Sequence, residues 1–309
     1  MAKKRPNVAY VKTLDVQRRK LVRLAEDRGA ARLKSLYDAA QDALEAKLRR
    51  APGGRRDTMT VYQQQLLLTQ VRQGQKLIAG RMTGELNDLS REAQVDSLRG
   101  LGSWMEKMGD EFGEAEVVLP TDEAARFWGV IDKRRTSLLA QHQKSMSAYG
   151  AANVLAMERQ LAVSLATGET VDQAADRVRE TADVEFWKAE RIARTETAWA
   201  YNATHADGIA DIAQEVDDLY MRWTEFVSDS GVPLDDRVGE DSVVMHGQVA
   251  RPGGVFTMPE DPRVSESMWG EEWEFPPNRP NDRCVLTAWR PHWGGLAWLW
   301  DGGKVYLSR

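Results

Sequence analysis

Apolar residues recur at helical spacing through most of the first half of the chain. A first stripe, from Asp15 to about Arg50, has as its apolar members Leu21, Leu24, Leu33, Leu36, Leu44 and Leu48. A second stripe, from Thr58 to about Phe112, keeps three-, four- and seven-residue steps through Val71, Ile78, Met82, Leu86, Leu89 and Ala93. Six glycines lie from position 74 to position 109. Each interior glycine costs about 1 kcal/mol relative to alanine, so we expect bends, or two or three shorter helices, in the second stretch.

Further helices follow, and their ends are marked. A helix capped by Thr121 is predicted to contain Phe127, Trp128, Ile131, Leu138 and Leu139. The next helix is predicted from about Ala151 to Ala166 and ends at Gly168, since glycine adopts the left-handed conformation common after a helix. Thr170 and Gln173 have the spacing of a capping box, which predicts a short helix after them.

The stretch Arg191–Ala213 predicts one helix with an apolar side that must be buried. That side consists of Ile192, Trp199, Ala203, Ala206, Ala210 and Ala213. Thr195 and Asn202 lie within it or at its edge, seven residues and so two turns apart. Because buried polar groups need hydrogen-bond partners, we expect these partners to come from chain that folds back over the helix.

The polar residues of this helix have two interpretations. Arg194, Ala198 and His205 form a neighbouring stripe that we expect to be more exposed, and Glu196 lies on the opposite edge. The residues form either a structural hydrogen-bond clasp or a catalytic pair of Arg194 and Glu196. The clasp is favoured, because nothing nearby supplies a nucleophile or a cluster of metal ligands.

The segments that could fold back lie downstream. Leu219–Val227 has strand composition and places Leu219, Met221 and Trp223 on one face. Two polar, turn-rich segments, Asp235–Arg237 and Pro280–Cys284, are the best candidates for partners of Thr195 and Asn202. Near the end, LAWLW and KVYL flank Asp-Gly-Gly, which predicts a β-hairpin.

These elements predict an α+β protein with a mainly helical N-terminal two-thirds and a small α+β C-terminal domain ending in a β-hairpin. We divide the chain into a basic helical region (1–120), a helical connector (121–184) and an α+β domain (185–309). Six of the eleven tryptophans lie at or after Trp269. They are expected to close the core of a small sheet domain, and a protein-docking patch is the other interpretation.

Composition adds little about the class of protein. The chain has 309 residues, 42% of them hydrophobic, and a single cysteine, so no internal disulfide is possible. No apolar run approaches the length that spans a bilayer, and the basic start lacks the apolar core of a secretory signal. We expect a protein that stays in the cytosol or in something assembled there, without contact with a membrane.

Charge is distributed unevenly. Residues 1–56 contain sixteen Lys and Arg against six Asp and Glu, a net charge of +10. Residues 215–309 contain nine Lys and Arg against seventeen Asp and Glu, a net charge of −8. The dense part of this basic arm is Lys3, Lys4, Arg5, Lys12, Arg18, Arg19, Lys20 and Arg23. It is either a solvated helix face or a contact for nucleic acid or an acidic protein surface, and both interpretations stay open.

Candidate chemistry is sparse. The sequence contains no phosphate-binding P-loop, dinucleotide fingerprint, G-x-S-x-G or His-Glu-x-x-His. His246 with Asp235, Asp236 and Cys284 could bind a metal, but their spacing is not compact. A structural hydrogen bond is therefore favoured for His246, and we expect neither metal nor cofactor.

Many polar and turn residues after Glu185 follow one another in a particular order. They are Arg194, Thr195, Glu196, Asn202, Trp223, Asp235, Asp236, Arg237, His246, Gly247, Phe256, Pro276, Pro277, Asn281, Arg283 and Cys284. In order and spacing they resemble the C-terminal domain of phage Mu F-like minor head proteins, also called phage head morphogenesis proteins. The resemblance covers about Glu185–Trp289. The predicted clasp set is Arg194, Thr195, Glu196, Asn202, Trp223, Asp235, Asp236, Arg237, His246, Asn281, Arg283 and Cys284.

The chain departs from its relatives at the cysteines. Many relatives carry Cys-x-x-Cys just after the Asp-Asp-Arg-Val stretch and Asn-Cys-Arg-Cys near the end. In this chain the first motif is replaced by a stretch with Gly239, Glu240 and Asp241. In the second motif Asp282 takes the place of the first cysteine, so Cys284 is the only cysteine of the two motifs that is present. A cysteine-based metal or redox role is therefore unsupported in this chain.

The resemblance implies a minor capsid protein of a tailed phage, inside the virion at the portal vertex and in the host cytoplasm during assembly. It implies action in head morphogenesis and DNA packaging or delivery, with the portal protein as partner and packaged DNA, scaffold or major capsid protein as further candidates. The alternative is an enzyme acting on nucleic acid, protein or nucleotide, because some Mu F-like chains carry such domains after the shared region. Only about twenty residues follow Trp289 here, too few for an added enzyme domain, which favours the structural role.

Overall fold

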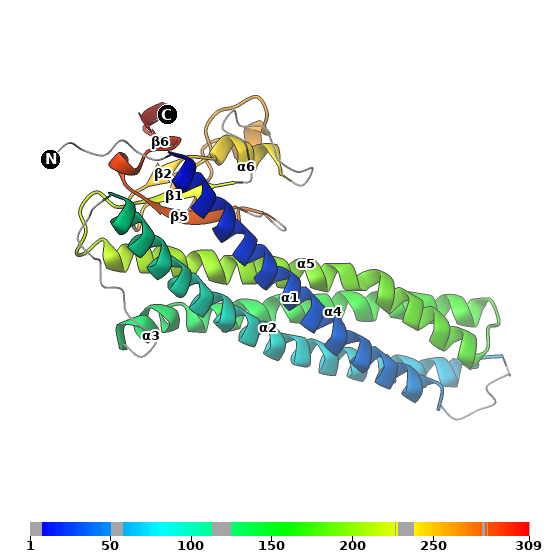
Figure 1. Cartoon of the computed structure of the whole chain (residues 1–309). Coiled ribbons are helices and arrows are strands. Elements are labelled where there is room, and N and C mark those ends of the chain that lie inside the picture. The colour runs from blue at the N-terminus through cyan, green and yellow to red at the C-terminus, as the bar shows by residue number, and fades with distance from the viewer. Residues whose placement is uncertain are drawn as a thin grey trace. The chain divides into compact units, whose positions relative to one another are not determined.

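The computed structural model describes residues 8–50, 58–112, 125–225, 227, 238–279, 282 and 284–308 (Figure 1). Its long elements are α1 (Val8–Leu48), α2 (Val61–Phe112), α3 (Ala125–Asp132), α4 (Arg135–Ala166) and α5 (Val171–Ile212). The rest are β1 (Tyr220–Thr224), α6 (Glu240–Met245), β2 (Val249–Ala250), β3 (Phe256–Thr257), η1 (Glu266–Met268), β4 (Glu272–Trp273), β5 (Val285–Trp289), η2 (Pro291–Trp293), β6 (Ala297–Trp300) and β7 (Lys304–Ser308). The predicted α+β class, with helices first and antiparallel strands after them, is confirmed.

The expectation of bends or shorter helices between Thr58 and Phe112 is wrong, because α2 is one helix of 52 residues. Packing explains why the glycines do not break it. A Cβ at Gly74 would lie only 2.8 Å from Leu44 Cδ1, so glycine there permits a close approach of α1. Burial of the apolar stripe stabilises the helix by more than the glycines weaken it, as helix stability in proteins comes mostly from tertiary packing.

The boundaries predicted between Thr121 and Ala151 are also wrong. Thr121 lies outside the described residues, and the interruption falls at residues 133 and 134, after which α4 continues without a break to Ala166. At this turn Lys133 Nζ and Arg134 Nε bond the buried carboxylate of Asp207 at 2.7 and 2.8 Å. These ion pairs link residues far apart in sequence, which local periodicity cannot reveal.

The predicted capping box is present. The Thr170 N–H donates to Gln173 Oε1 at 2.9 Å, and the Gln173 N–H donates to Thr170 Oγ1 at 3.3 Å. It opens α5, which has 42 residues and joins the expected short helix and the Arg191–Ala213 helix into one. Gly168 precedes it with φ of +72°, as expected for the residue that closes α4.

The chain forms two compact units, each built from separate segments. Unit 1 consists of residues 1–26, 90–136 and 195–309, and unit 2 of residues 27–89 and 137–194. Helices α1, α2 and α5 therefore each contribute residues to both units, so the units do not follow the linear division at residues 120 and 184.

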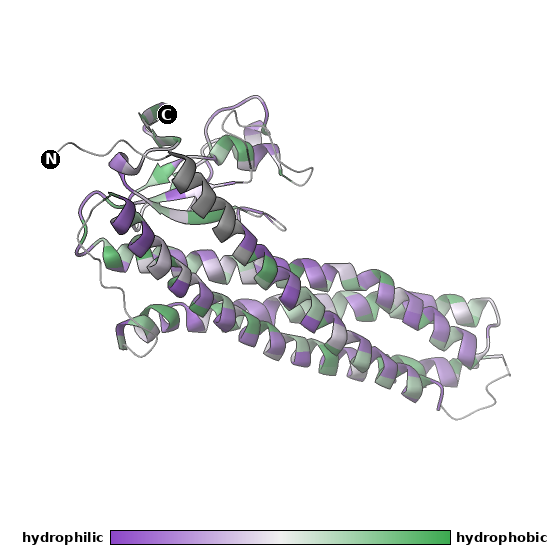
Figure 2. Cartoon of the chain, viewed as in Figure 1, coloured by the Kyte–Doolittle hydropathy of each residue, from purple (hydrophilic) through white to green (hydrophobic). Residues whose placement is uncertain are grey.

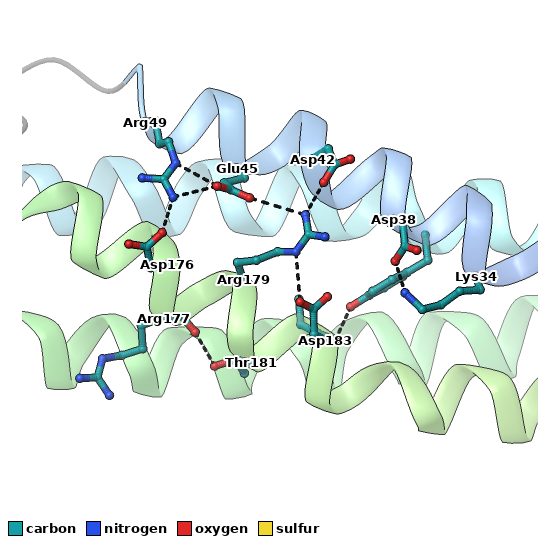
Figure 3. Close-up of polar contacts among 12 residues, drawn as sticks. Lys34, Asp38, Asp42, Glu45, Arg49, Asp176, Arg177, Arg179, Thr181 and Asp183 are labelled. Atoms are coloured by element: carbon teal, nitrogen blue, oxygen red, sulfur yellow. Dashed lines mark hydrogen bonds and ion pairs between the residues drawn. The ribbon is translucent and has the colours of Figure 1, made fainter.

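Unit 2 is a helical bundle. Parts of α1, α2, α4 and α5 share one apolar core, whose largest buried side chains include Leu33, Tyr37, Leu48, Leu67, Met82 and Leu86. Ion pairs join α1 to α5 at its surface, as Figure 3 shows for Arg179 of α5 with Asp42 of α1. Arg179 also pairs with Asp183 within α5. The core provides most of the stabilisation, since exposed ion pairs each contribute about 0–1 kcal/mol.

Unit 1 contains the strands. A three-stranded antiparallel sheet has the order β2-β1-β5, and Trp223 of β1 lies opposite Leu286 of β5. β3 pairs with β4, and β6 with β7 forms the predicted C-terminal hairpin. The sheet is buried on both faces, because all five residues of β1 and of β5 are buried.

The tryptophans near the end of the chain mostly serve the core of unit 1. Trp289, Trp293 and Trp298 are at most 2% exposed, and Trp300 is half-buried. Trp298 donates its Nε1–H to the carbonyl oxygen of His246 at 3.0 Å.

Hydrophobic and hydrophilic residues are interspersed along the helices (Figure 2). Among the described residues no helix combines the length and the apolar character needed to cross a membrane.

Candidate functional site

Asn202 lies at the centre of the predicted clasp. It is on α5, has no exposed surface, and faces β5. Its Nδ2–H donates to the carbonyl oxygen of Cys284 at 3.1 Å, and its Oδ1 accepts from the N–H of Leu286 at 2.9 Å. Of the two segments that the sequence had indicated as partners, the described residues thus show Asn202 bonded to Cys284, the last residue of Pro280–Cys284.

The geometry of these two bonds explains why an amide is needed. β5 is an outer strand of its sheet: one of its edges pairs with β1, and the other edge pairs with no described strand. The carbonyl of one residue and the N–H of the residue two further on point to the same side of a strand. The Asn202 amide offers one donor and one acceptor, as a neighbouring strand would, so it pairs backbone groups at the open edge of β5.

Cys284, at the start of β5, belongs to a buried cluster with Glu225 and Asp282. The Cys284 thiol donates to Glu225 Oε2 at 2.8 Å, and Asp282 Oδ1 accepts from the Cys284 N–H at 3.1 Å. Asp282 also accepts from Ser242 Oγ at 3.2 Å and from the Asn278 N–H at 3.1 Å. The chain just before β5 is therefore held by this cluster in two places: to α6 through Ser242, and to the end of β1 through Glu225.

Burial governs the titration of this cluster. It raises the pKa of the Cys284 thiol well above its ordinary value, and the neighbouring Asp282 and Glu225 act in the same direction. It also raises the pKa of Asp282, against the effect of the hydrogen bonds from Cys284 and Asn278. Cys284 is therefore a thiol and not a reactive thiolate at neutral pH.

The same three side chains are the only described group with the arrangement of a metal site. Their ligand atoms lie within 4.8 Å of one another, and zinc accepts both thiolate and carboxylate. All three are buried and are hydrogen-bonded within the cluster. The sequence interpretation missed Glu225 and Asp282 as neighbours of Cys284. The β1–β5 register could have found Glu225, because Thr224 pairs with Val285 and the next residues outward are Glu225 and Cys284.

His246 makes the structural hydrogen bond that was favoured for it. Its Nδ1 accepts from the N–H of Glu225 at 3.0 Å, so this nitrogen carries no proton in the neutral ring. Its position after α6 places it beside the end of β1.

Trp223, also in the predicted set, is fully buried and packs edge-to-face on Phe256 with ring centroids 5.3 Å apart.

The other α5 residues are distributed differently from the prediction. Arg194 bonds Asp27 at 2.6 Å and Glu190 at 2.9 Å, and neither belongs to the predicted set. Thr195 is half-buried, whereas Glu196 is buried. Among the described residues, Arg194 therefore forms an ion-pair group with Asp27 and Glu190.

The expectation of an exposed stripe at His205 is wrong. His205 has no exposed surface, and its Nδ1 lies 3.3 Å from Ser97 Oγ, which donates to the carbonyl oxygen of Tyr201 at 2.8 Å. Ser97 belongs to α2, so a helix from earlier in the chain covers this side of α5. α5 is thus buried over a wider arc in unit 1 than its own pattern suggests.

Several predicted residues lie outside the described part of the chain. In the clasp set these are Asp235, Asp236, Arg237, Asn281 and Arg283. In the basic arm, Lys3, Lys4 and Arg5 lie outside it, and of Lys12, Arg18 and Arg19 only the helical backbone in α1 is described. Lys20 and Arg23 are exposed on α1.

Comparison with known proteins identifies one family. Residues 155–287 match the family described as Phage Mu protein F like protein, which confirms the resemblance over that range. The range is less than half of the chain and contains α5, β1 and most of β5, so it includes Asn202 and both of its partners. No curated protein and no solved structure gives a match.

Proposed function

We propose that this chain, with its Mu F-like region, is a minor head protein associated with the portal vertex of a tailed phage. In this proposal it takes part in head assembly and in DNA packaging or delivery. The observation that carries the proposal is the family match of residues 155–287. The Asn202 clasp then has a structural role, because it ties β5 to α5 within the matched region.

The basic arm supports a polyanionic or acidic partner. Residues 1–56 carry a net charge of +10, and Lys20 and Arg23 are exposed on α1. Packaged DNA, or acidic surfaces of the portal, scaffold or major capsid protein, would complement this charge. Binding of this kind ignores base sequence and weakens steeply with salt.

DNA binding tests this part of the proposal. The change Lys20→Glu with Arg23→Glu in the full chain should weaken binding and make the slope of log affinity against log salt shallower by about 2, near 0.9 for each lost phosphate contact. Lys144→Glu with Arg159→Glu is the matched control, because it makes the same charge change at exposed positions of α4. Equal weakening by both pairs would show that only net charge matters and would count against a specific basic arm.

Portal association has its own test. Heads assembled without portal protein should lack this chain, whereas heads with portal should contain it, as measured by quantitative mass spectrometry. Wild-type amounts in portal-free heads would refute the portal vertex while leaving a head protein in place.

The enzyme alternative makes a different prediction for α5. Any nuclease or transferase activity that depended on Arg194 and Glu196 would disappear in Arg194→Ala and Glu196→Ala while the fold stayed intact. Activity that survives both changes would not belong to this helix.

A further inference from the structure

Two outer strands of unit 1 have edges of different character. The outer edge of β5 is occupied by Asn202, whose amide pairs backbone groups as a neighbouring strand would. β7 has β6 along one edge, and its other edge pairs with no described strand. An open edge presents a row of backbone N–H and C=O groups with which another strand can pair.

The β6–β7 hairpin is fixed to the rest of unit 1 through β6. The Trp298 N–H donates to the carbonyl oxygen of Gly247 at 2.9 Å, and Trp298 forms a parallel bridge with Gln248, the residue before β2. The Trp298 side chain is 2% exposed. β7 is therefore an edge strand carried by an anchored, buried neighbour.

The apolar side chains of β7 are exposed. Val305, Tyr306 and Leu307 are 47%, 45% and 38% exposed. They are consecutive, whereas the other exposed large apolar residues in the described part of unit 1, Leu24 and Val255, stand singly in the sequence. Single exposed apolar residues are normal, but an apolar group on an edge strand marks a place where another strand can pair.

β7 carries few of the features that protect open edges in other proteins. Val305–Leu307 contains neither proline nor a charged residue. The register shift of the hairpin falls at its open end, where Leu307 lies opposite no residue of β6. The pairs that Lys304, Val305 and Tyr306 form with β6 keep one register, so most of β7 is a regular strand.

The residues of β7 favour a second copy of the same strand as its partner. In each antiparallel register that places Val305 opposite Val305, Tyr306 or Leu307 of the other copy, Lys304 lies opposite an uncharged residue. Apolar and aromatic cross-strand pairs stabilise a sheet, whereas like charges directly opposite each other destabilise it. A two-fold axis produces such an antiparallel pair, and it is the commonest symmetry of protein oligomers.

We propose that β7 is a self-association surface, at which two copies of this chain pair antiparallel through the outer edges of their β7 strands. The pairing joins the two hairpins into one sheet and covers Val305 and Leu307 of both copies. Because β7 has only five residues, the interface is small and the association is weak and dependent on concentration. The inference does not depend on the proposed phage function.

Sedimentation velocity of the full chain from low to high micromolar concentration tests the proposal. The wild type should shift from monomer toward dimer as the concentration rises. Val305→Lys introduces a charge into the pair and should weaken dimerisation at least tenfold, since like charges brought together at an interface are costly. Val255→Lys is the matched control, because it makes the same change at an exposed valine of unit 1 outside β7, and it should dimerise like the wild type.

A mixing experiment identifies the strand that pairs. One variant carries Val305→Lys with Leu307→Lys, and the other carries Val305→Glu with Leu307→Glu. Each variant alone should stay monomeric, because like charges meet across the two-fold axis. Their mixture should form dimers, because opposite charges then face each other, and dimers in the mixture also show that both variants are folded.

Hydrogen exchange of the wild type gives an answer that does not depend on any variant. Amides of β7 should exchange more slowly as the concentration rises, whereas amides of α4 should not change. A wild type that stays monomeric at every concentration would overturn the proposal. So would a dimer that Val305→Lys does not weaken, or exchange in β7 that is independent of concentration.

Discussion

Asn202 on α5 and Asn153 on α4 are both fully buried asparagines on long helices, one in each compact unit. Asn202 uses its amide as donor and acceptor to the backbone of β5. Asn153 instead has another side chain, that of Tyr149 on the same helix, as its hydrogen-bonding neighbour. The same buried side chain therefore does two different things: Asn202 ties a strand to a helix across a long sequence separation, whereas Asn153 bonds within its own helix.

The two units also differ in where they place their charged side chains. Unit 2 carries its ion pairs at the surface between α1 and α5, where Arg49 joins Glu45 and Asp176 (Figure 3). Unit 1 instead buries carboxyl groups, with Glu225 and Asp282 both 2% exposed beside Cys284. Unit 1 thus combines its apolar core with a few matched buried bonds, whereas unit 2 keeps these charged pairs at the surface of its apolar core.

The largest expected effect comes from breaking the Asn202 clasp. Asn202→Ala leaves the Leu286 N–H and the Cys284 carbonyl buried without a partner, at about 1–3 kcal/mol for each unsatisfied group. Asn202→Leu leaves the same two groups unsatisfied and adds overpacking, so it should cost about 1–3 kcal/mol more than Asn202→Ala. Urea unfolding followed by tryptophan fluorescence would measure the loss.

The control for this prediction lies on the exposed side of the chain. Gln143→Leu on α4 introduces the same apolar group at an exposed position and should change the free energy of unfolding by less than about 0.5 kcal/mol. If Asn202→Ala unfolds like the wild type but fails to enter heads, Asn202 contacts a partner and the structural interpretation is wrong.

Much of the helical part could be predicted because its signals are local. The apolar period located α1, the capping box at Thr170 and Gln173 located the start of α5, and alternation located β1. The burial of Asn202 also followed from helical geometry alone. Its partner segment followed from the need to satisfy a buried amide.

The features that were missed depend on contacts between distant segments. The continuity of α2 reflects packing such as Leu44 against Gly74, and the burial of His205 reflects coverage by Ser97 of α2. The pairing of Glu225 with Cys284 depends on strand register, which joins residues 59 positions apart. None of these can be read from the period of one segment.

A pH change should affect unit 2 next most strongly, through His142. Burial lowers the pKa of His142 from 6.5 to about 4, and its Nδ1–H donates to Asn87 Oδ1 at 2.7 Å. The unfolded chain binds the proton at higher pH than the folded chain, so stability falls as pH drops from 6.5 to 4. The full shift corresponds to about 3 kcal/mol.

Comparison of variants isolates this contribution. Urea unfolding at pH 7 and pH 4.5 should show a smaller loss of stability in His142→Gln than in the wild type, because glutamine does not titrate. An identical loss in both proteins would mean that other groups cause the acid sensitivity of unit 2.

A smaller effect is expected at Cys284. Cys284→Ser keeps a donor for Glu225 Oε2 but replaces a soft, buried sulfur by a more polar oxygen, so it should cost about 1 kcal/mol. Cys284→Ala removes the donor and should cost more. A zinc assay on the purified wild type provides the check, since stoichiometric zinc together with failed head assembly in Cys284→Ser would contradict a purely structural thiol.

The smallest effect should come from the ion pairs of unit 2, which tests whether its stability resides in the apolar core. Arg179 bonds Asp42 on α1 and lies 3.2 Å from Asp183, but the carboxylate of Asp42 is largely exposed. Arg179→Met keeps the aliphatic stem and removes the charge, so it should cost less than about 1 kcal/mol at low salt. The difference in the free energy of unfolding between this variant and the wild type should shrink further in 1 M NaCl, where the screening length is about 3 Å. A loss as large as that of Asn202→Ala, undiminished by salt, would mean that unit 2 is held by its charges and would remove the contrast between the two units.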